Sequence, residues 1–287
     1  MTWSPYEEAV LQAVARHRRT RTPLQVMLDN LARPLTWVNQ LLRQIPGSAK
    51  TQDRIAKAVE TAAERITQLA QRPGAFETAR DAYARAGMAV HTWQDIRTKP
   101  LEDQDRAVAA LPASWVYGAV EGGVVGLVQG LTEWQVLSWL ALAAGDVSAT
   151  LWLGARDTAL VAACYGFNPA REDMLPHLLA GMIPAQDWES VEFLGLKALL
   201  GHPWGTRHLL AQIADAWVRR MTLILTDKEI AVTVPVAGAV VNAGLNAAYL
   251  RGIRQSAQDY FRLLTLSERH GSDAVLQALG AAEQALA

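Results

Sequence analysis

The sequence contains a single cysteine, Cys164, in 287 residues. One thiol excludes an internal disulfide and any metal site built from several thiolates. Aromatic residues make up only 7% of the chain, and runs in which Val, Ile or Thr alternate with polar residues are few, so little in the sequence predicts β-strands. The formal net charge is −1, which leaves no overall basic field to attract nucleic acid. These shortages favour a helical protein of a reducing compartment that does not bind nucleic acid.

The first 30 residues also lack a continuous apolar run, and they carry Glu7, Glu8 and Asp29. This pattern does not fit a secretory signal peptide, so we expect a cytoplasmic protein. Any contact with a membrane would then be made by the mature chain.

Alanine and leucine are abundant and charged residues are 19% of the chain, a composition typical of helices. The length is enough to bury a large core without metal or disulfides. The sequence predicts an all-α fold: a single multi-helix bundle around Gly/Ala-rich apolar central helices. Residues 1–110 would supply N-terminal amphipathic helices and residues 111–287 the helical core of one continuous domain.

The centre of the prediction is an apolar stretch of small residues from Ser114 to Asn168. It opens with four glycines at intervals of four: Gly118, Gly122, Gly126 and Gly130. Each glycine in a helix costs about 1 kcal/mol relative to alanine, so this face must gain stability from close approach of another backbone. A second small-residue stretch, from Ile230 to Leu250, is the candidate partner within the chain.

Several helix boundaries follow from local signals. Ser4 predicts an N-cap, with Pro5 at the first helical position and Glu7 completing a capping box. The basic run that ends this helix, from His17 to Arg21, has two interpretations: a solvated helix end that complements the dipole, or a contact with anionic lipid.

Further along the chain, we expect one helix from Ala75 to Ile96 and a charged connection from Lys99 to Arg106. Asn168 and Pro169 should begin another helix, and Asp187 should cap the helix that runs to Leu200.

Asp146 is the only charge between Trp134 and Ala155. It fits an N-cap for a helix from Val147 to Tyr165, or a buried carboxylate kept for a polar site, and the two roles are compatible. Asn242 and Asn246 fall one turn apart in the second small-residue stretch, and their amides need hydrogen-bond partners if buried.

The apolar segments Trp134–Ala155 and Ile230–Leu250 have about the length of a membrane-spanning helix. Asp146 would cost about 2.5 to 3.5 kcal/mol in the bilayer, which roughly cancels the gain from the Leu and Val residues. We therefore expect helices buried in protein, with partial insertion left open. Tryptophans bracket the apolar segments, as either an interfacial belt or ordinary core residues would: Trp115, Trp134, Trp139 and Trp152.

No motif predicts a metal or cofactor. His202 and His208 lack a carboxylate at the spacing of an H-E-x-x-H helix, so they are expected to be loop and surface histidines. The sequence also shows no motif for a nucleophile with an adjacent base, and none for a phosphate-binding loop.

With these motifs in view, the chain resembles the EcsC family of bacterial proteins. The matching segments follow in order over nearly the whole length: Tyr6-Glu7-Glu8, Leu41 to Pro46 and the helix after it, the Gly-rich centre, Asp146, Tyr165 to Asn168, Val234 to Gly238, Asn242, Asn246, and Tyr260-Phe261-Arg262. The match is looser at His17, where many members have tryptophan.

The resemblance implies a cytoplasmic or peripheral inner-membrane protein, from a family named after an operon that also encodes an ABC transporter linked to protein secretion. It implies no established catalytic activity, and it places Asp146, Tyr165, Asn242 and Asn246 in the family pattern.

Three hypotheses remain. The first is a non-enzymatic helical protein that binds lipid or a membrane protein at the cytoplasmic membrane face. The second is a small-molecule-binding or hydrolytic protein with a polar pocket between the Gly-rich helices, lined by Asp146, Tyr165 and Asn246. The third is a scaffold that oligomerises through its glycine face, although the sequence sets no oligomeric state.

Overall fold

A computed structural model describes residues 2–20, 74–112, 151–188, 200 and 238–286. The described part consists of helices, 3-10 turns and connecting segments, with no strand among these residues. The all-α prediction is therefore confirmed. The glycines at 118 to 130, Asp146, His202 and His208 lie outside the described residues. Of the predicted helix that ends at Leu200, only Asp187, Trp188 and Leu200 are described.

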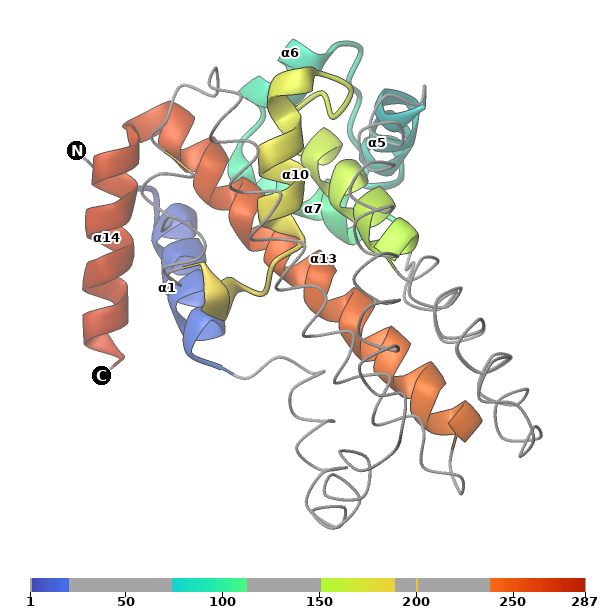
Figure 1. The fold of residues 1–287 in the computed structure, drawn as a ribbon. Coiled ribbons are helices and arrows are strands. Elements are labelled where there is room, and N and C mark those ends of the chain that lie inside the picture. Colours follow the sequence, from blue (N-terminus) through green and yellow to red (C-terminus); the bar gives the residue numbers. More distant parts are fainter. Residues whose placement is uncertain (1, 21–73, 113–150, 189–199, 201–237, 287) are drawn as a thin grey trace, which may run out of the picture.

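Helix α13 (Gly238–His270) is the axis of the described bundle (Figure 1). At 33 residues it extends for about 50 Å. From Gly238 on, the second small-residue stretch continues into the amphipathic stretch as this one helix, because no proline separates them and Gly252 leaves open space where a side chain would be. Gly271, with φ +87, then turns the chain into α14 (Ser272–Ala285).

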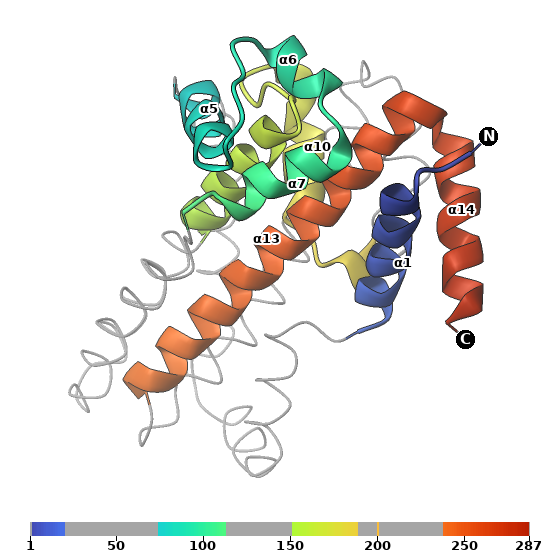
Figure 2. The same cartoon turned by 180° about the vertical axis from the view of Figure 1, so that it is seen from behind.

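Helix α1 (Pro5–Arg19) begins as predicted. The Ser4 side chain accepts a hydrogen bond from the Glu7 backbone N–H, and the Glu7 carboxylate accepts one from the Ser4 N–H. Figures 1 and 2 show α1 beside α14 and across the second half of α13. The first described helix thus packs on the last two.

The predicted single helix from Ala75 to Ile96 is wrong. The structure has α5 (Ala75–Arg85), a turn at Gly87 with φ +78, and the short helix α6 (Trp93–Thr98). Thr92 caps α6 in a capping box with Asp95, a local signal that overrides the apolar periodicity.

The predicted charged connection from Lys99 to Arg106 is also wrong. It forms most of α7 (Leu101–Ala109), which starts directly after Pro100 and carries two acidic residues in its first turn, Glu102 and Asp103. Carboxylates at a helix N-terminus stabilise it through the helix dipole, so a charged run can be a helix start.

The helix over 151–164 ends at Gly166, whose φ of +83 lies in the left-handed region. The Phe167 N–H reaches back to the Ala162 carbonyl, as in a Schellman motif. Asn168 does not start a regular helix as predicted. Its side chain accepts from the Ala170 N–H in a turn, and helix follows only after the 3-10 segment η2 (Glu172–Met174).

Helix α10 (Leu175–Gly181) and the 3-10 segment η3 (Ala185–Asp187) complete the described chain. Asp187 closes η3, and the helix it was expected to cap lies outside the described residues apart from Leu200.

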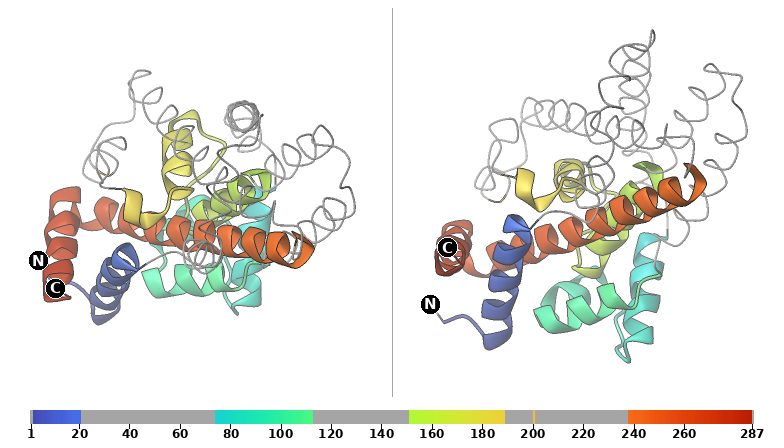
Figure 3. Two further views of the ribbon diagram at one scale, coloured as in Figure 1. Left: turned by 60° about the horizontal axis from the view of Figure 1, so that its bottom comes forward. Right: turned by 90° about the horizontal axis from the view of Figure 1, so that it is seen from below.

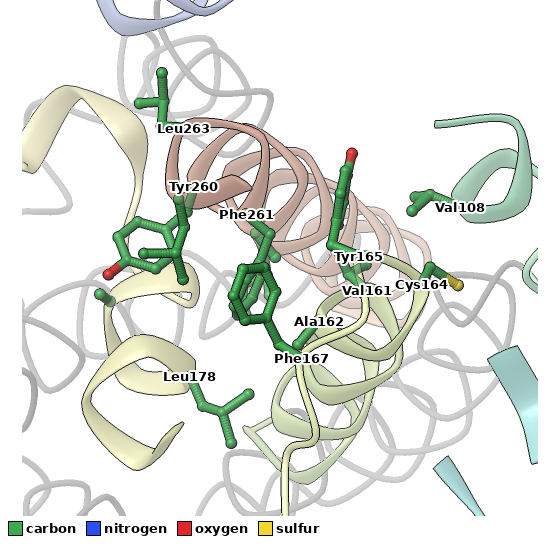
Figure 4. Packing of buried hydrophobic residues seen from close by; sticks show 14 of the residues in the cluster. Val108, Val161, Ala162, Cys164, Tyr165, Phe167, Leu178, Tyr260, Phe261 and Leu263 are labelled. Carbon is green, nitrogen blue, oxygen red and sulfur yellow. The ribbon is translucent and has the colours of Figure 1, made fainter. Parts of the chain in front are cut away.

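Small residues allow close packing against α13. A Cβ atom on Gly154 would lie 2.7 Å from the Ile253 Cδ1, and one on Gly181 would lie 3.5 Å from the Ala257 Cα. Figure 4 shows aromatic side chains filling the adjoining space, where Phe167 meets Phe261 with ring centroids 5.6 Å apart. Gly154 thus lets helix 151–164 lie close to the central helix, whereas the tightest contact of a Cβ on Gly181, at 3.1 Å, would be with Thr158 of helix 151–164.

Candidate functional site

Six polar side chains meet where α1, α7, α13 and the end of helix 151–164 come together. We call them the buried ionic cluster: Tyr6, His17, Asp105, Tyr165, Asp259 and Arg262. The Asp105 and Asp259 side chains are only 7% and 1% exposed. Burial of two carboxylates is costly unless they are paired, so the arrangement of their partners determines what the cluster can do.

Arg262 binds Asp105 through both arms of the guanidinium. Its Nε lies 3.0 Å from Oδ1, and its Nη2 lies 3.0 Å from Oδ2. The third nitrogen, Nη1, lies 3.1 Å from Oδ1 of Asp259. Burial would lower the pKa of Arg262, but Tyr165 and the two carboxylates outweigh burial and raise the pKa above its usual value. Arg262 is therefore a permanent cation shared between two acids.

Two tyrosines complete the coordination of Asp105. The Tyr6 hydroxyl donates to Oδ2 at 2.6 Å, and the Tyr165 hydroxyl donates to Oδ1. Burial, together with the negative charge of Asp105, raises the pKa of both hydroxyls well above the usual tyrosine value. Both side chains are thus neutral hydrogen-bond donors at physiological pH.

His17 joins the cluster from the C-terminal end of α1, with Nδ1 lying 2.5 Å from Oδ2 of Asp259. At the other end of α1, the Nε2 of His270 lies 3.1 Å from Oε1 of Glu7. Burial would raise the pKa of Glu7, but hydrogen bonds from Ser4 and His270 outweigh it and lower the pKa. Helix α1 is therefore fixed to α13 near both of its ends.

The geometry makes the cluster a clamp between helices. Both oxygens of Asp105 accept from a tyrosine and from the guanidinium, so the carboxylate is already engaged by fixed protein donors. Among the described residues, no group of three or more His, Cys, Asp or Glu side chains is placed to hold a metal ion.

The predicted site residues are not all brought together. Tyr165 lies in the buried ionic cluster, whereas Asn246, also buried, precedes Arg262 by sixteen residues on α13. Sixteen residues correspond to about 24 Å of helix, so Tyr165 and Asn246 sit at different levels of the bundle. Asn242 lies on α13 one turn before Asn246, with its side chain outside the description, and Asp146 falls outside the described residues altogether.

Asp105, the centre of the cluster, was not predicted from the sequence. Its signal was its register: Leu101 lies four residues before it and Val108 three residues after it, and both are buried. An acid on the apolar face of a helix indicates a buried partner.

A second feature lies on the surface at the start of helix 151–164. Trp152 is 38% exposed, and Arg156, one turn later, places its Cζ 5.9 Å from the centroid of the indole ring. This cation–π pair combines a large aromatic surface with a positive charge that is free to face solvent or an anionic surface.

In the described part of the chain, no helix combines the length and the hydropathy needed to cross a membrane. Comparisons of the chain with known protein families, with curated proteins and with solved structures give no match.

Proposed function

We propose that this protein is non-enzymatic and binds the anionic lipid surface on the cytoplasmic face of a membrane, which agrees with the cytoplasmic or peripheral location that the resemblance to the EcsC family implies. The observation that carries the proposal is the exposed pair of Trp152 and Arg156. Tryptophan is favoured at the boundary between water and lipid, and a basic residue near an anionic leaflet gains about 1 kcal/mol.

The position of the pair in the sequence supports the same function. Trp152 lies at the end of the apolar segment Trp134–Ala155, and Arg156 is the first basic residue after it. An aromatic residue followed by a cation is typical of the edge of a lipid-contacting segment.

The buried ionic cluster supports the non-enzymatic part of the proposal. A general acid or base must reach a substrate, but the donors around Asp105 belong to the protein itself. The Tyr165 hydroxyl, a lining group in the pocket hypothesis, donates to Asp105. These contacts count against Asp105 and Tyr165 as catalytic groups.

Flotation with vesicles tests the proposal. We expect the protein to float with vesicles that contain phosphatidylglycerol and to remain at the bottom with pure phosphatidylcholine. Arg156→Ala should weaken binding about fivefold and Trp152→Ala by a similar factor, whereas Arg80→Ala, the same charge change at an exposed position of α5, should not.

Protein that stays at the bottom with both vesicle types rejects lipid binding. An equal loss in the Arg80→Ala control rejects Trp152 and Arg156 as the contact. If a membrane protein takes the place of lipid as the partner, binding to native membranes will be lost after those membranes are treated with protease.

A further inference from the structure

A groove runs along the edge of the bundle between α1 and α14, which lie side by side at one end of the described structure (Figure 3). Its volume is about 610 Å³. The floor is apolar and built mostly from small side chains: Leu11, Ala278, Ala281, Ala282 and Ala285. Trp3 and Leu286 also line the groove, and Leu286 is 43% exposed. Alanines on such a floor let another helix approach closely.

The two helices run in the same direction, and two contacts set their register. Trp3 packs on His270, with ring centroids 4.5 Å apart, and Arg18 forms an ion pair with Glu283 at 2.7 Å. Leu286 therefore lies about one turn beyond the level of Arg18. The groove extends from the level of Trp3 to that of Leu286, and Gln12 lies near its middle.

The α1 side of the groove carries a regular charge pattern. Glu8, Gln12 and Arg16 are spaced four residues apart and line the same wall. Successive members are separated by about 6 Å along the helix. The wall is thus acidic at one end, neutral in the middle and basic at the other end.

This pattern is self-complementary. A two-fold axis through Gln12, perpendicular to α1, places Glu8 of one copy opposite Arg16 of the other and the reverse pair on the other side of the axis. The same rotation brings the level of Trp3 in one copy opposite the level of Leu286 in the other. Apolar ends meet and opposite charges meet, as an isologous interface requires.

We propose that this groove is a self-association surface, which binds the same groove of a second copy of the chain about a two-fold axis near Gln12. The α1–α14 pair of one copy then packs face to face on the same pair of the other copy, with the helices antiparallel across the interface. The surface is separate from Trp152 and Arg156, so the dimer does not depend on the proposed membrane binding.

Sedimentation equilibrium of the full chain, over about 1 to 100 μM, tests the proposal. We expect a monomer–dimer equilibrium that weakens at high salt. Glu8→Arg and Arg16→Glu should each weaken the dimer at least about tenfold, because each change turns two attractive pairs into two repulsive ones. Glu77→Arg, at an exposed position of α5, is the matched control and should have no effect.

The decisive variant combines Glu8→Arg with Arg16→Glu. The double exchange restores opposite charges only if Glu8 faces Arg16 of a second copy, so it should recover dimerisation. Thermal unfolding by circular dichroism, recorded for each variant, shows whether α1 remains folded. A wild-type monomer at 100 μM, a dimer insensitive to Glu8→Arg, or a folded double variant that stays monomeric overturns the proposal.

Discussion

Replacing Asp105 with asparagine should destabilise the protein strongly, although the two side chains have nearly the same shape. The change removes the charge that Arg262 binds with two nitrogens. It also replaces either Oδ1 or Oδ2 by an NH₂ group, which then faces a donor from Arg262 and a hydroxyl from Tyr6 or Tyr165. Asp105→Asn therefore leaves a buried cation short of one partner and places donors against donors.

The magnitude follows from the burial of the pair. Breaking a buried ion pair by removal of one partner costs about 3 to 5 kcal/mol. Arg262 keeps its contact with Asp259, so we expect the lower end, about 3 kcal/mol. For a chain of this size, such a loss lowers the Tm by roughly 6 to 12 °C.

Thermal and urea unfolding followed by circular dichroism measure this loss. The matched control is Asp103→Asn on the same helix, where the acid pairs with Arg106, whose side chain is 57% exposed. A surface pair of this kind contributes at most about 1 kcal/mol. If Asp105→Asn costs no more than Asp103→Asn, the clamp role of the buried ionic cluster is refuted.

Three further predictions concern other positions. Burial lowers the pKa of His177 to about 4, so the folded protein binds fewer protons than the unfolded chain between pH 6.5 and 4. The free energy of unfolding should therefore fall by about 3 kcal/mol as the pH drops through that window. His177→Gln should flatten this decline in urea titrations at acid pH, and an unchanged decline would contradict the role of His177. Gly166→Ala should cost about 2 kcal/mol in thermal unfolding, because φ is +83 and the new Cβ would lie 2.9 Å from the Arg97 backbone nitrogen. Gly252→Ala, with open space around it, should be neutral or stabilising. Equal effects of the two substitutions would disprove the reasoning. Ser4→Ala removes the cap of α1 and should cost about 1 kcal/mol in the same assay, and an unchanged Tm would count against the capping box.

Local signals predicted the structure best where one residue type has one dominant role. Ser4, Pro5 and Glu7 form the expected helix start, and the turn at Gly166 ends a helix close to where the sequence placed it. These signals act over a few residues, so the sequence alone contains them.

Tertiary partners account for what the local signals did not reveal. The segment from Lys99 to Arg106 is rich in charge, and nothing near it shows that Asp105 is buried against Arg262, 157 residues away. The same limit applies to the site. Tyr165 could be selected from the family resemblance, but its partner Asp105 could not, because no local signal near Tyr165 indicates a carboxylate 60 residues earlier in the chain.

The contact between His17 and Asp259 spans 242 residues. At a synthesis rate of about 5 to 20 residues per second, helix α1 leaves the ribosome roughly 10 to 50 s before its partner on α13 exists. During that interval its apolar face, with Val10, Leu11 and Val14, lacks the native surfaces of α13 and α14. Nascent chains of this protein should therefore need shielding at their N-terminal helix, and a ribosome-associated chaperone should crosslink there until α13 has emerged.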